Sequence, residues 1–177
     1  MAKIIVFSPT STRFDGGSLD RGVAVSGAET VIIQTMKHMA KVGHEVIVYC
    51  PCEEEGVYDG VQYKEYMFFD KDKLECDLYI LNRRIWNLPV HIKYKKAAVF
   101  SQDVFETPCW EGINYLKKSK IDAWIFLSKF HRMNVMESVK DIPLDKTYII
   151  GNGVPDYLLN MSKKKVYGQL IYSSVPF

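Results

Sequence analysis

The stretch 26–51, SGAETVIIQTMKHMAKVGHEVIVYCP, decides the fold of this 177-residue chain. Its start favours a helix, because the Ser26 hydroxyl can cap a first turn and Gly27 lets a ligand approach the backbone closely. Gly43 can take the left-handed conformation that ends a helix. Between them, apolar residues recur at the spacing of one buried helix face: Ile32, Met36, Met39 and Ala40. The stretch therefore predicts a helix that begins after Ser26 and ends before Gly43.

Short apolar runs lie on both sides of this helix. Residues 3–8 (KIIVFS) precede it and residues 46–49 (VIVY) follow it. Uninterrupted apolar runs of this length are typical of buried parallel strands. The order strand, loop, helix, strand is a βαβ unit, whose first loop lies where such sheets bind ligands.

Further strands and helices alternate along the chain. Strands are expected at 62–69, 77–81, 95–101, 121–127 and 146–150, and helices at 108–118 and 129–139. The first helix is expected to bury Trp110, Ile113 and Leu116, and the second to bury Phe130, Met133, Val135 and Met136. The alternation predicts an α/β fold with a doubly wound, mostly parallel, Rossmann-like sheet.

The composition indicates an ordinary globular protein, with 47% hydrophobic and 25% charged residues. A net charge of +2 is too small to favour nucleic acid as a partner. No apolar run approaches the ~20 residues that a membrane span needs, although peripheral membrane contact stays compatible with the sequence. The four cysteines are irregularly spaced, and we expect buried thiols, no metal ion and a cytoplasmic location.

Two segments outside the regular elements are candidates for binding. The loop 9–25 contains Gly16 and Gly17, and its backbone N–H groups could hold a phosphate or carboxylate; a flexible surface insertion is the alternative. Arg83, at the end of the strand 77–81, could face a ligand, but ordinary surface charge is favoured for it. The dinucleotide and P-loop glycine patterns are absent from the sequence.

Ordered motifs along the chain carry a family resemblance. They are 27–29 (GAE), 43–46 (GHEV), 121–128 (IDAWIFLS), 149–154 (IIGNGV) and 170–174 (LIYSS). In this order they resemble the N-terminal, acceptor-side domain of retaining glycosyltransferases of family 4. The resemblance implies one half of a GT-B fold, with residues 1–160 as the Rossmann-like domain. Residues 161–177 would then be a linker and the first strand of a missing C-terminal donor domain.

The resemblance also implies roles for particular residues. Ser26 and Gly27 match the turn that meets the donor phosphates, although the family usually has glycine where this chain has Ser26. Gln102 and Asp103 match the cleft position where many members have His-Asp, and Gln102 cannot exchange a proton as histidine does. The remaining matches are strand ends that face the cleft: Ser128, Asn152 and Gly153. A helix cap and a tight turn would explain these three locally.

The implied function is transfer of a sugar, with retention, from a nucleotide-sugar donor to an acceptor hydroxyl. The partners would be a sugar or glycan acceptor and, together with the C-terminal domain, the nucleotide-sugar, with no metal or other cofactor. This chain alone would then be nearly inactive. Two alternatives stay open: a stand-alone carbohydrate-binding or regulatory half-domain that needs a separate donor-binding subunit, and an unrelated α/β nucleotide-binding domain.

Overall fold

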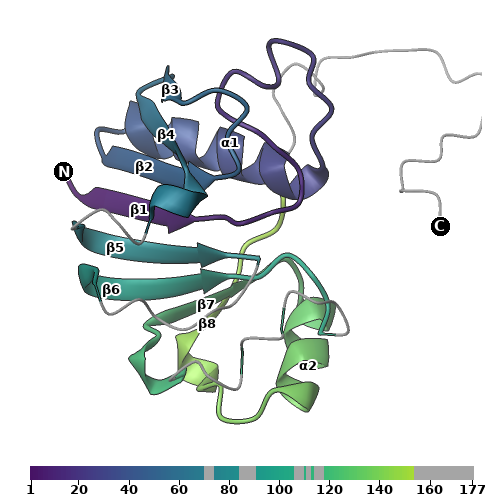
Figure 1. Cartoon of the computed structure of the whole chain (residues 1–177). Coiled ribbons are helices and arrows are strands. Elements are labelled where there is room, and N and C mark those ends of the chain that lie inside the picture. Colours follow the sequence, from purple (N-terminus) through teal and green to yellow (C-terminus); the bar gives the residue numbers. More distant parts are fainter. Residues whose placement is uncertain (70–73, 84–90, 106–109, 111–112, 114–117, 154–177) are drawn as a thin grey trace, which may run out of the picture.

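The computed structural model describes residues 1–69, 74–83, 91–105, 110, 113 and 118–153 (Figure 1). The strands are β1 (Lys3–Phe7), β2 (Glu45–Cys50), β3 (Gly56–Tyr58), β4 (Val61–Glu65), β5 (Glu75–Asn82), β6 (Lys93–Phe100), β7 (Ala123–Phe126) and β8 (Thr147–Ile149). The α-helices of the described part are α1 (Gly27–Lys41) and α2 (Lys129–Ser138). Short 3-10 helices cover Tyr66–Phe68, Lys118–Lys120 and Leu144–Lys146.

The described strands form one eight-stranded sheet in the order β3-β4-β2-β1-β5-β6-β7-β8. Every neighbouring pair is parallel except β3 and β4. The sheet confirms the expected α/β fold and the βαβ unit formed by β1, α1 and β2. Along this unit, Ser26 caps α1 and Gly43 has a φ of +97°, so the predicted helix ends are also confirmed.

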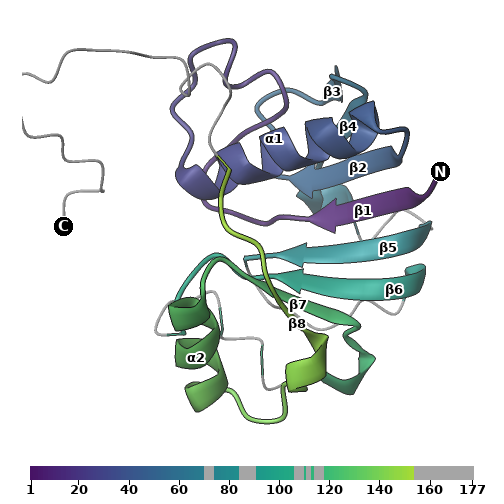
Figure 2. The same cartoon turned by 180° about the vertical axis from the view of Figure 1, so that it is seen from behind.

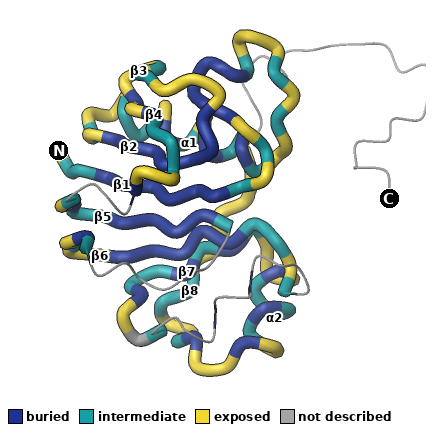
Figure 3. The backbone as a smooth tube through the Cα atoms, viewed as in Figure 1, coloured by how far each residue is buried: buried dark blue, intermediate teal, exposed yellow. Residues whose placement is uncertain are grey.

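Alternate residues of the strands face two separate cores, one on each side of the sheet. Ile4 of β1 packs in the same core as Ile32 and Met36 of α1. Ile5 of the same strand packs in the opposite core with Val135 of α2. The two helices therefore cover opposite faces, as a doubly wound sheet requires (Figures 1 and 2). The central strands are buried along most of their length, and exposure concentrates at the loops (Figure 3).

One edge of the sheet differs from the prediction. The strand expected at 62–69 is β4, which ends at Glu65 and continues into a 3-10 helix. Before it, β3 forms an unpredicted antiparallel hairpin with β4. A turn joins the two strands, and in it Asp59 and Gly60 have φ values of +50° and +80°. Two left-handed residues in a row suit a tight hairpin, whose twist matches that of the flanking strands.

The predicted buried face of α2 is wrong in part. Val135 is fully buried, but Phe130 and Met133 are 73% and 58% exposed. The inward side of this short helix is formed by His131 and Val135, which are four residues apart. Phe130 and Met133 lie outside that stripe.

Several predictions fall outside the described residues. These are most of the helix expected at 108–118, including Leu116, and everything from residue 154 onward, including the domain boundary at 160 and the strand near 170. Within the expected helix, Trp110 and Ile113 are described and are buried as predicted.

Candidate functional site

The strand order of the sheet changes direction between β1 and β5. From β1 the chain passes through α1 to β2 and then to β4, and it returns to β5 on the other side of β1. The direction of winding therefore reverses between β1 and β5. In open parallel sheets, the crevice outside the carboxyl ends of the strands at such a point is the usual ligand site.

A line of polar side chains crosses the strand ends at this point. Ser8 follows β1, Asn82 ends β5, and Gln102 lies two residues beyond β6. The Asn82 amide donates to Ser8 Oγ over 2.8 Å, and the Gln102 amide donates to Asn82 Oδ1 over 2.8 Å. Ser8 and Asn82 are fully buried. These hydrogen bonds join the ends of β1, β5 and β6. They therefore fix the positions of Arg83 and Asp103, the residues that follow Asn82 and Gln102.

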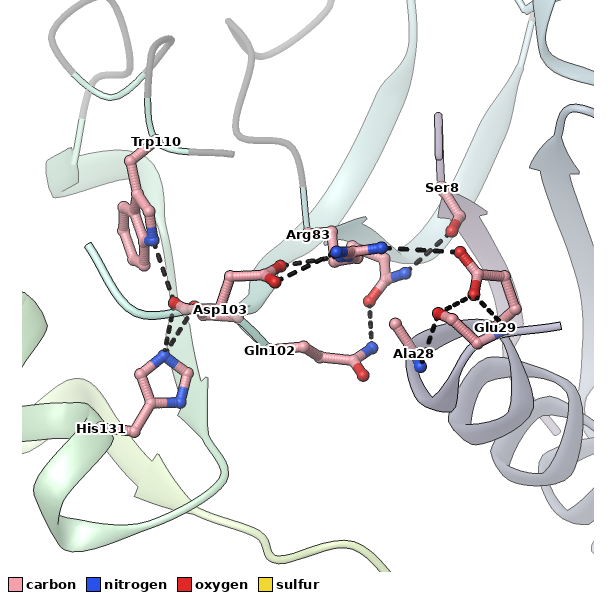
Figure 4. Close-up of polar contacts among 11 residues, drawn as sticks. Ser8, Ala28, Glu29, Arg83, Gln102, Asp103, Trp110 and His131 are labelled. Carbon is pink, nitrogen blue, oxygen red and sulfur yellow. Dashed lines mark hydrogen bonds and ion pairs between the residues drawn. The ribbon is translucent and has the colours of Figure 1, made fainter. Parts of the chain in front are cut away.

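Arg83 is the centre of a charged cluster beside this line (Figure 4). Its Nε and Nη2 donate to the two carboxylate oxygens of Asp103 over 2.7 and 3.1 Å, the bidentate geometry that arginine favours. Its Nη1 lies 3.6 Å from Oε1 of Glu29, on α1. Arg83 has a φ of +63°, a conformation that is uncommon for residues other than glycine. Its surroundings therefore hold Arg83 in place, and it is not the ordinary surface charge that the sequence favoured.

The first turn of α1 lies against the same cluster. The Ser26 hydroxyl accepts from the backbone N–H of Ala28, and the Glu29 carboxylate accepts from the backbone N–H of Ser26 over 3.0 Å. This reciprocal pair is a capping box. Gly27 is exposed, and a Cβ built on it would meet no atom within 4 Å. The backbone at Gly27 is therefore exposed, and ligand binding there stays a prediction.

The main chain of Asp103 is anchored from the other side by buried side chains. Its carbonyl oxygen accepts from Trp110 Nε1 over 3.1 Å and from His131 Nε2 over 2.8 Å. His131 Nδ1 accepts from the backbone N–H of Leu127, so the hydrogen bonds define the neutral tautomer with its proton on Nε2. Burial lowers the pKa of His131, which is consistent with that neutral form.

Gly16 and Gly17 pack against Tyr58 of the hairpin β3–β4. A Cβ on Gly16 would lie 2.4 Å from Cβ of Tyr58, and a Cβ on Gly17 would lie 2.9 Å from Cε1 of the same tyrosine. Gly16 needs glycine because the hairpin β3–β4 packs directly against it, and Gly17 is enclosed by Tyr58 of the hairpin and by the side chain of Arg21. This packing accounts for both glycines, and donor binding by them stays a prediction.

The middle of the loop 9–25 is built around the buried Asp15. Its carboxylate accepts from the backbone N–H groups of Gly17 and Glu54 over 2.8 and 3.0 Å, and from Arg21 over 2.6 Å. Phe14 and Ser18 are also fully buried. The central part of the loop is therefore packed into the fold and is not a flexible surface insertion.

The other predicted site residues lie at the ends of β7 and β8. Ser128 follows β7 and caps α2, since its hydroxyl accepts from the backbone N–H of His131 over 3.1 Å. Asn152 and Gly153 follow β8 and are exposed. The structure thus brings Gln102, Asp103 and Arg83 together beside Ser26 and Gly27. For Ser128, Asn152 and Gly153, a role in binding stays a prediction.

Sequence reasoning missed Glu29 and His131 as members of the site. The Ser-x-x-Glu spacing at 26–29 predicts a capping box, so Glu29 could have been placed beside Ser26. Nothing local to the sequence pairs Glu29 with Arg83, or His131 with the carbonyl of Asp103, because these contacts join separate strands and helices.

Cys50 and Cys52 are free thiols and are buried, as expected. Their sulfur atoms are 3.6 Å apart, and burial raises the pKa of the Cys50 thiol. Cys76 is buried as well. In the described ranges, no group of three or more histidine, cysteine or acidic side chains could hold a metal ion. Nor does any helix in this part of the chain combine the length and apolar character needed to cross a bilayer.

Comparison with known proteins finds no matching family model, no similar curated protein and no similar solved structure.

Proposed function

We propose that this chain is the acceptor-side domain of a retaining glycosyltransferase. The motif order supports the family, and one structural observation supports the site. The Arg83–Asp103 pair lies at the carboxyl ends of β5 and β6, with the open backbone of Gly27 beside it. A sugar transfer needs a place for the leaving diphosphate next to a place for the acceptor hydroxyl.

The residues divide between these two needs. The exposed N-terminal turn of α1 carries backbone N–H groups and the positive end of the helix dipole, which suit a diphosphate. Asp103 accepts hydrogen bonds from hydroxyl groups and would orient the acceptor. Gln102 adds a neutral amide that can bind a second hydroxyl without taking up a proton. Catalysis would then depend on positioning and on electrostatic stabilisation of the leaving group.

The cytoplasm is the location we propose for this activity. Cys50, Cys52 and Cys76 are buried free thiols, which a reducing compartment preserves. The nucleotide-sugar donor, and any contact with the periphery of a membrane, belong to the same proposal.

Binding experiments on this chain test the proposal. We would titrate the ¹⁵N-labelled protein with neutral oligosaccharides and with UDP, GDP and ADP, and follow the amide signals of Gln102, Asp103 and Gly27. The proposal expects an oligosaccharide to shift Gln102 and Asp103 in the absence of nucleotide. The variant Asp103→Asn should weaken that binding at least tenfold, while Asp20→Asn, at an exposed carboxylate, should not.

Two results would separate the alternatives. Binding of a nucleotide with no oligosaccharide binding would contradict the proposal and favour an unrelated nucleotide-binding domain. Oligosaccharide binding combined with no sugar transfer by the protein isolated from its natural source would favour a stand-alone binding module. The intact mass of that natural protein, compared with 20.4 kDa for this chain, shows whether a donor domain is attached.

A further inference from the structure

Glu29 is the least satisfied charged group in the candidate site. Its side chain is fully buried. Oε2 accepts from both the backbone N–H and the hydroxyl of Ser26. Oε1 has no hydrogen-bond partner among the described residues and lies 3.6 Å from Arg83 Nη1, an ion pair that is too long for a hydrogen bond. A buried carboxylate oxygen without a donor is unfavourable, so this arrangement is incomplete.

The position that Glu29 occupies is one that an anion would take. The N-terminal turn of a helix attracts negative charge through its unpaired N–H groups and its dipole. Glu29 already supplies a carboxylate to this turn, from inside the fold. A diphosphate that approaches Ser26 and Gly27 therefore meets a negative charge and finds the Ser26 donors in use.

A second position for the same carboxylate lies close by. Figure 4 shows Glu29 between the first turn of α1 and Arg83, and its two oxygens contact Ser26 and Arg83 respectively. A small rotation away from Ser26 would bring Oε1 within hydrogen-bond distance of Arg83. The group would lose two hydrogen bonds from Ser26 and gain one from Arg83, and all three are charge-assisted because Glu29 is ionised. The observed position is therefore favoured without a ligand, and the second becomes accessible when an anion takes over the Ser26 donors.

We propose that Glu29 is a displaceable internal ligand of the α1 N-terminus, which a diphosphate expels toward Arg83. The identity of the anion as the diphosphate of a sugar donor rests on the proposed function. When the anion takes the Ser26 donors, Glu29 closes its contact with Arg83. Arg83 holds Asp103 through two hydrogen bonds. The exchange therefore couples occupation of the phosphate position to the carboxylate that would meet the acceptor.

Inorganic pyrophosphate is the probe that tests this exchange. We would titrate it into the whole chain and follow the backbone amides of Ser26 and Gly27 together with the Arg83 Nε–H signal. In the unsubstituted protein, all three signals should shift with one dissociation constant. Glu29→Gln removes the competing charge and should tighten binding at least tenfold. Glu137→Gln, at an exposed carboxylate on α2, is the matched control and should change nothing.

Arg83→Gln separates this exchange from direct binding of phosphate by the arginine. If Arg83 acts by receiving Glu29, Arg83→Gln weakens pyrophosphate binding alone but has no effect when Glu29→Gln is also present. If Arg83 contacts phosphate itself, the weakening persists in the double variant, and the exchange is overturned. Binding in Glu29→Gln that is equal to or weaker than in the unsubstituted protein also overturns it, as does the absence of pyrophosphate binding in both.

These outcomes are independent of the test for sugar transfer. Tighter pyrophosphate binding by Glu29→Gln, combined with no oligosaccharide binding, would leave the exchange in place and remove the glycosyltransferase proposal. Oligosaccharide binding with no effect of Glu29→Gln on pyrophosphate binding would overturn the exchange and leave the glycosyltransferase proposal in place.

Discussion

Two sites in this molecule pair buried carboxylates with an arginine. They differ in whether every carboxylate oxygen accepts a hydrogen bond. In the loop 9–25, Asp15 pairs with Arg21, and both of its oxygens also accept from backbone N–H groups. At the strand ends, Arg83 serves two carboxylates, those of Asp103 and Glu29. One oxygen of Glu29 has no hydrogen bond among the described residues, although the side chain is fully buried.

The difference separates a structural site from a candidate functional site. A buried carboxylate with all its oxygens satisfied gains nothing from a ligand, and its contacts hold a segment in one conformation. A buried carboxylate oxygen that lacks a donor carries an uncompensated desolvation cost, and a rearrangement or a ligand could reduce it. We therefore assign the Asp15 site to folding of the loop, and a binding role for the Arg83 cluster remains our proposal.

The largest effect should come from breaking the complete site. Asp15→Ala removes the acceptor for Arg21 and for the backbone N–H groups of Gly17 and Glu54. Buried donors left without partners, together with the lost ion pair, should lower the free energy of unfolding by about 2–4 kcal/mol. Urea denaturation measures this loss.

Asp20→Asn is the control for this change, because Asp20 is exposed in the same loop. It should alter the free energy of unfolding by less than about 0.5 kcal/mol. If Asp15→Ala were equally mild, the loop would not depend on Asp15, and the comparison between the two sites would fail.

A glycine from each region gives the next largest contrast. In Gly16→Ala, the new methyl group would meet Cβ of Tyr58 at 2.4 Å, so the hairpin β3–β4 must shift. We expect a loss of about 1–3 kcal/mol, as for other overpacked sites. In Gly27→Ala, the methyl group meets nothing within 4 Å, and alanine favours a helix more than glycine does. That variant should be as stable as the original or more stable by up to about 1 kcal/mol.

The two glycine variants are compared by their thermal midpoints. A Gly16→Ala protein as stable as Gly27→Ala would show that Tyr58 moves at no cost, and the loop would then be less tightly packed than the contacts indicate. A larger substitution, Gly27→Trp, should also fold, but it should abolish pyrophosphate binding at the α1 N-terminus.

Much of the fold could be predicted from local sequence. The stretch 26–51 contains a cap, an apolar helix face, a terminating glycine and a buried strand, and each acts within a few residues of itself. The parallel strands followed from their apolar runs. The hairpin partner β3 was missed because Gly56–Tyr58 is short and half exposed, so it carries no hydrophobic pattern. Phe130 and Met133 were misplaced because, in a 10-residue helix, several apolar stripes fit the same sequence.

For the site, the sequence could predict which residues follow the ends of strands, but not which side chains pair with one another. The family resemblance placed Gln102 and Asp103 at the cleft, and both follow the carboxyl end of β6. Arg83 was favoured as ordinary surface charge, and its pairing with Asp103 was missed. Which oxygen pairs with which nitrogen depends on the spacing between β5, β6 and α1. For that reason the partners Glu29 and His131 could not be derived from the sequence.

Substitution at the incomplete site should affect stability less than at Asp15. Gln can replace Glu in a capping box, so Glu29→Gln retains the contact with Ser26. It loses an ion pair at 3.6 Å and relieves a buried charge that lacks a donor. We expect the free energy of unfolding to change by less than about 1 kcal/mol, measured in urea beside Asp15→Ala. A loss as large as that of Asp15→Ala would show that Glu29 is structural.

The smallest effect should be a pH dependence that comes from His131, beneath the Arg83 cluster. Burial lowers its pKa in the folded chain, so below about pH 6.5 the unfolded chain binds more protons than the folded chain. The free energy of unfolding should therefore fall as the pH decreases from 6.5 toward the folded-state pKa, and this contribution should level off below it.

His131→Gln isolates that contribution, because glutamine keeps an N–H donor for the carbonyl of Asp103 and does not titrate in this range. The stability difference between the original protein and the variant should be largest at pH 7 and should shrink toward pH 5. Parallel stability curves for the original protein and His131→Gln would mean that His131 accepts a proton without loss of its contacts. The carbonyl of Asp103 would then be held equally well by the neutral and the protonated imidazole.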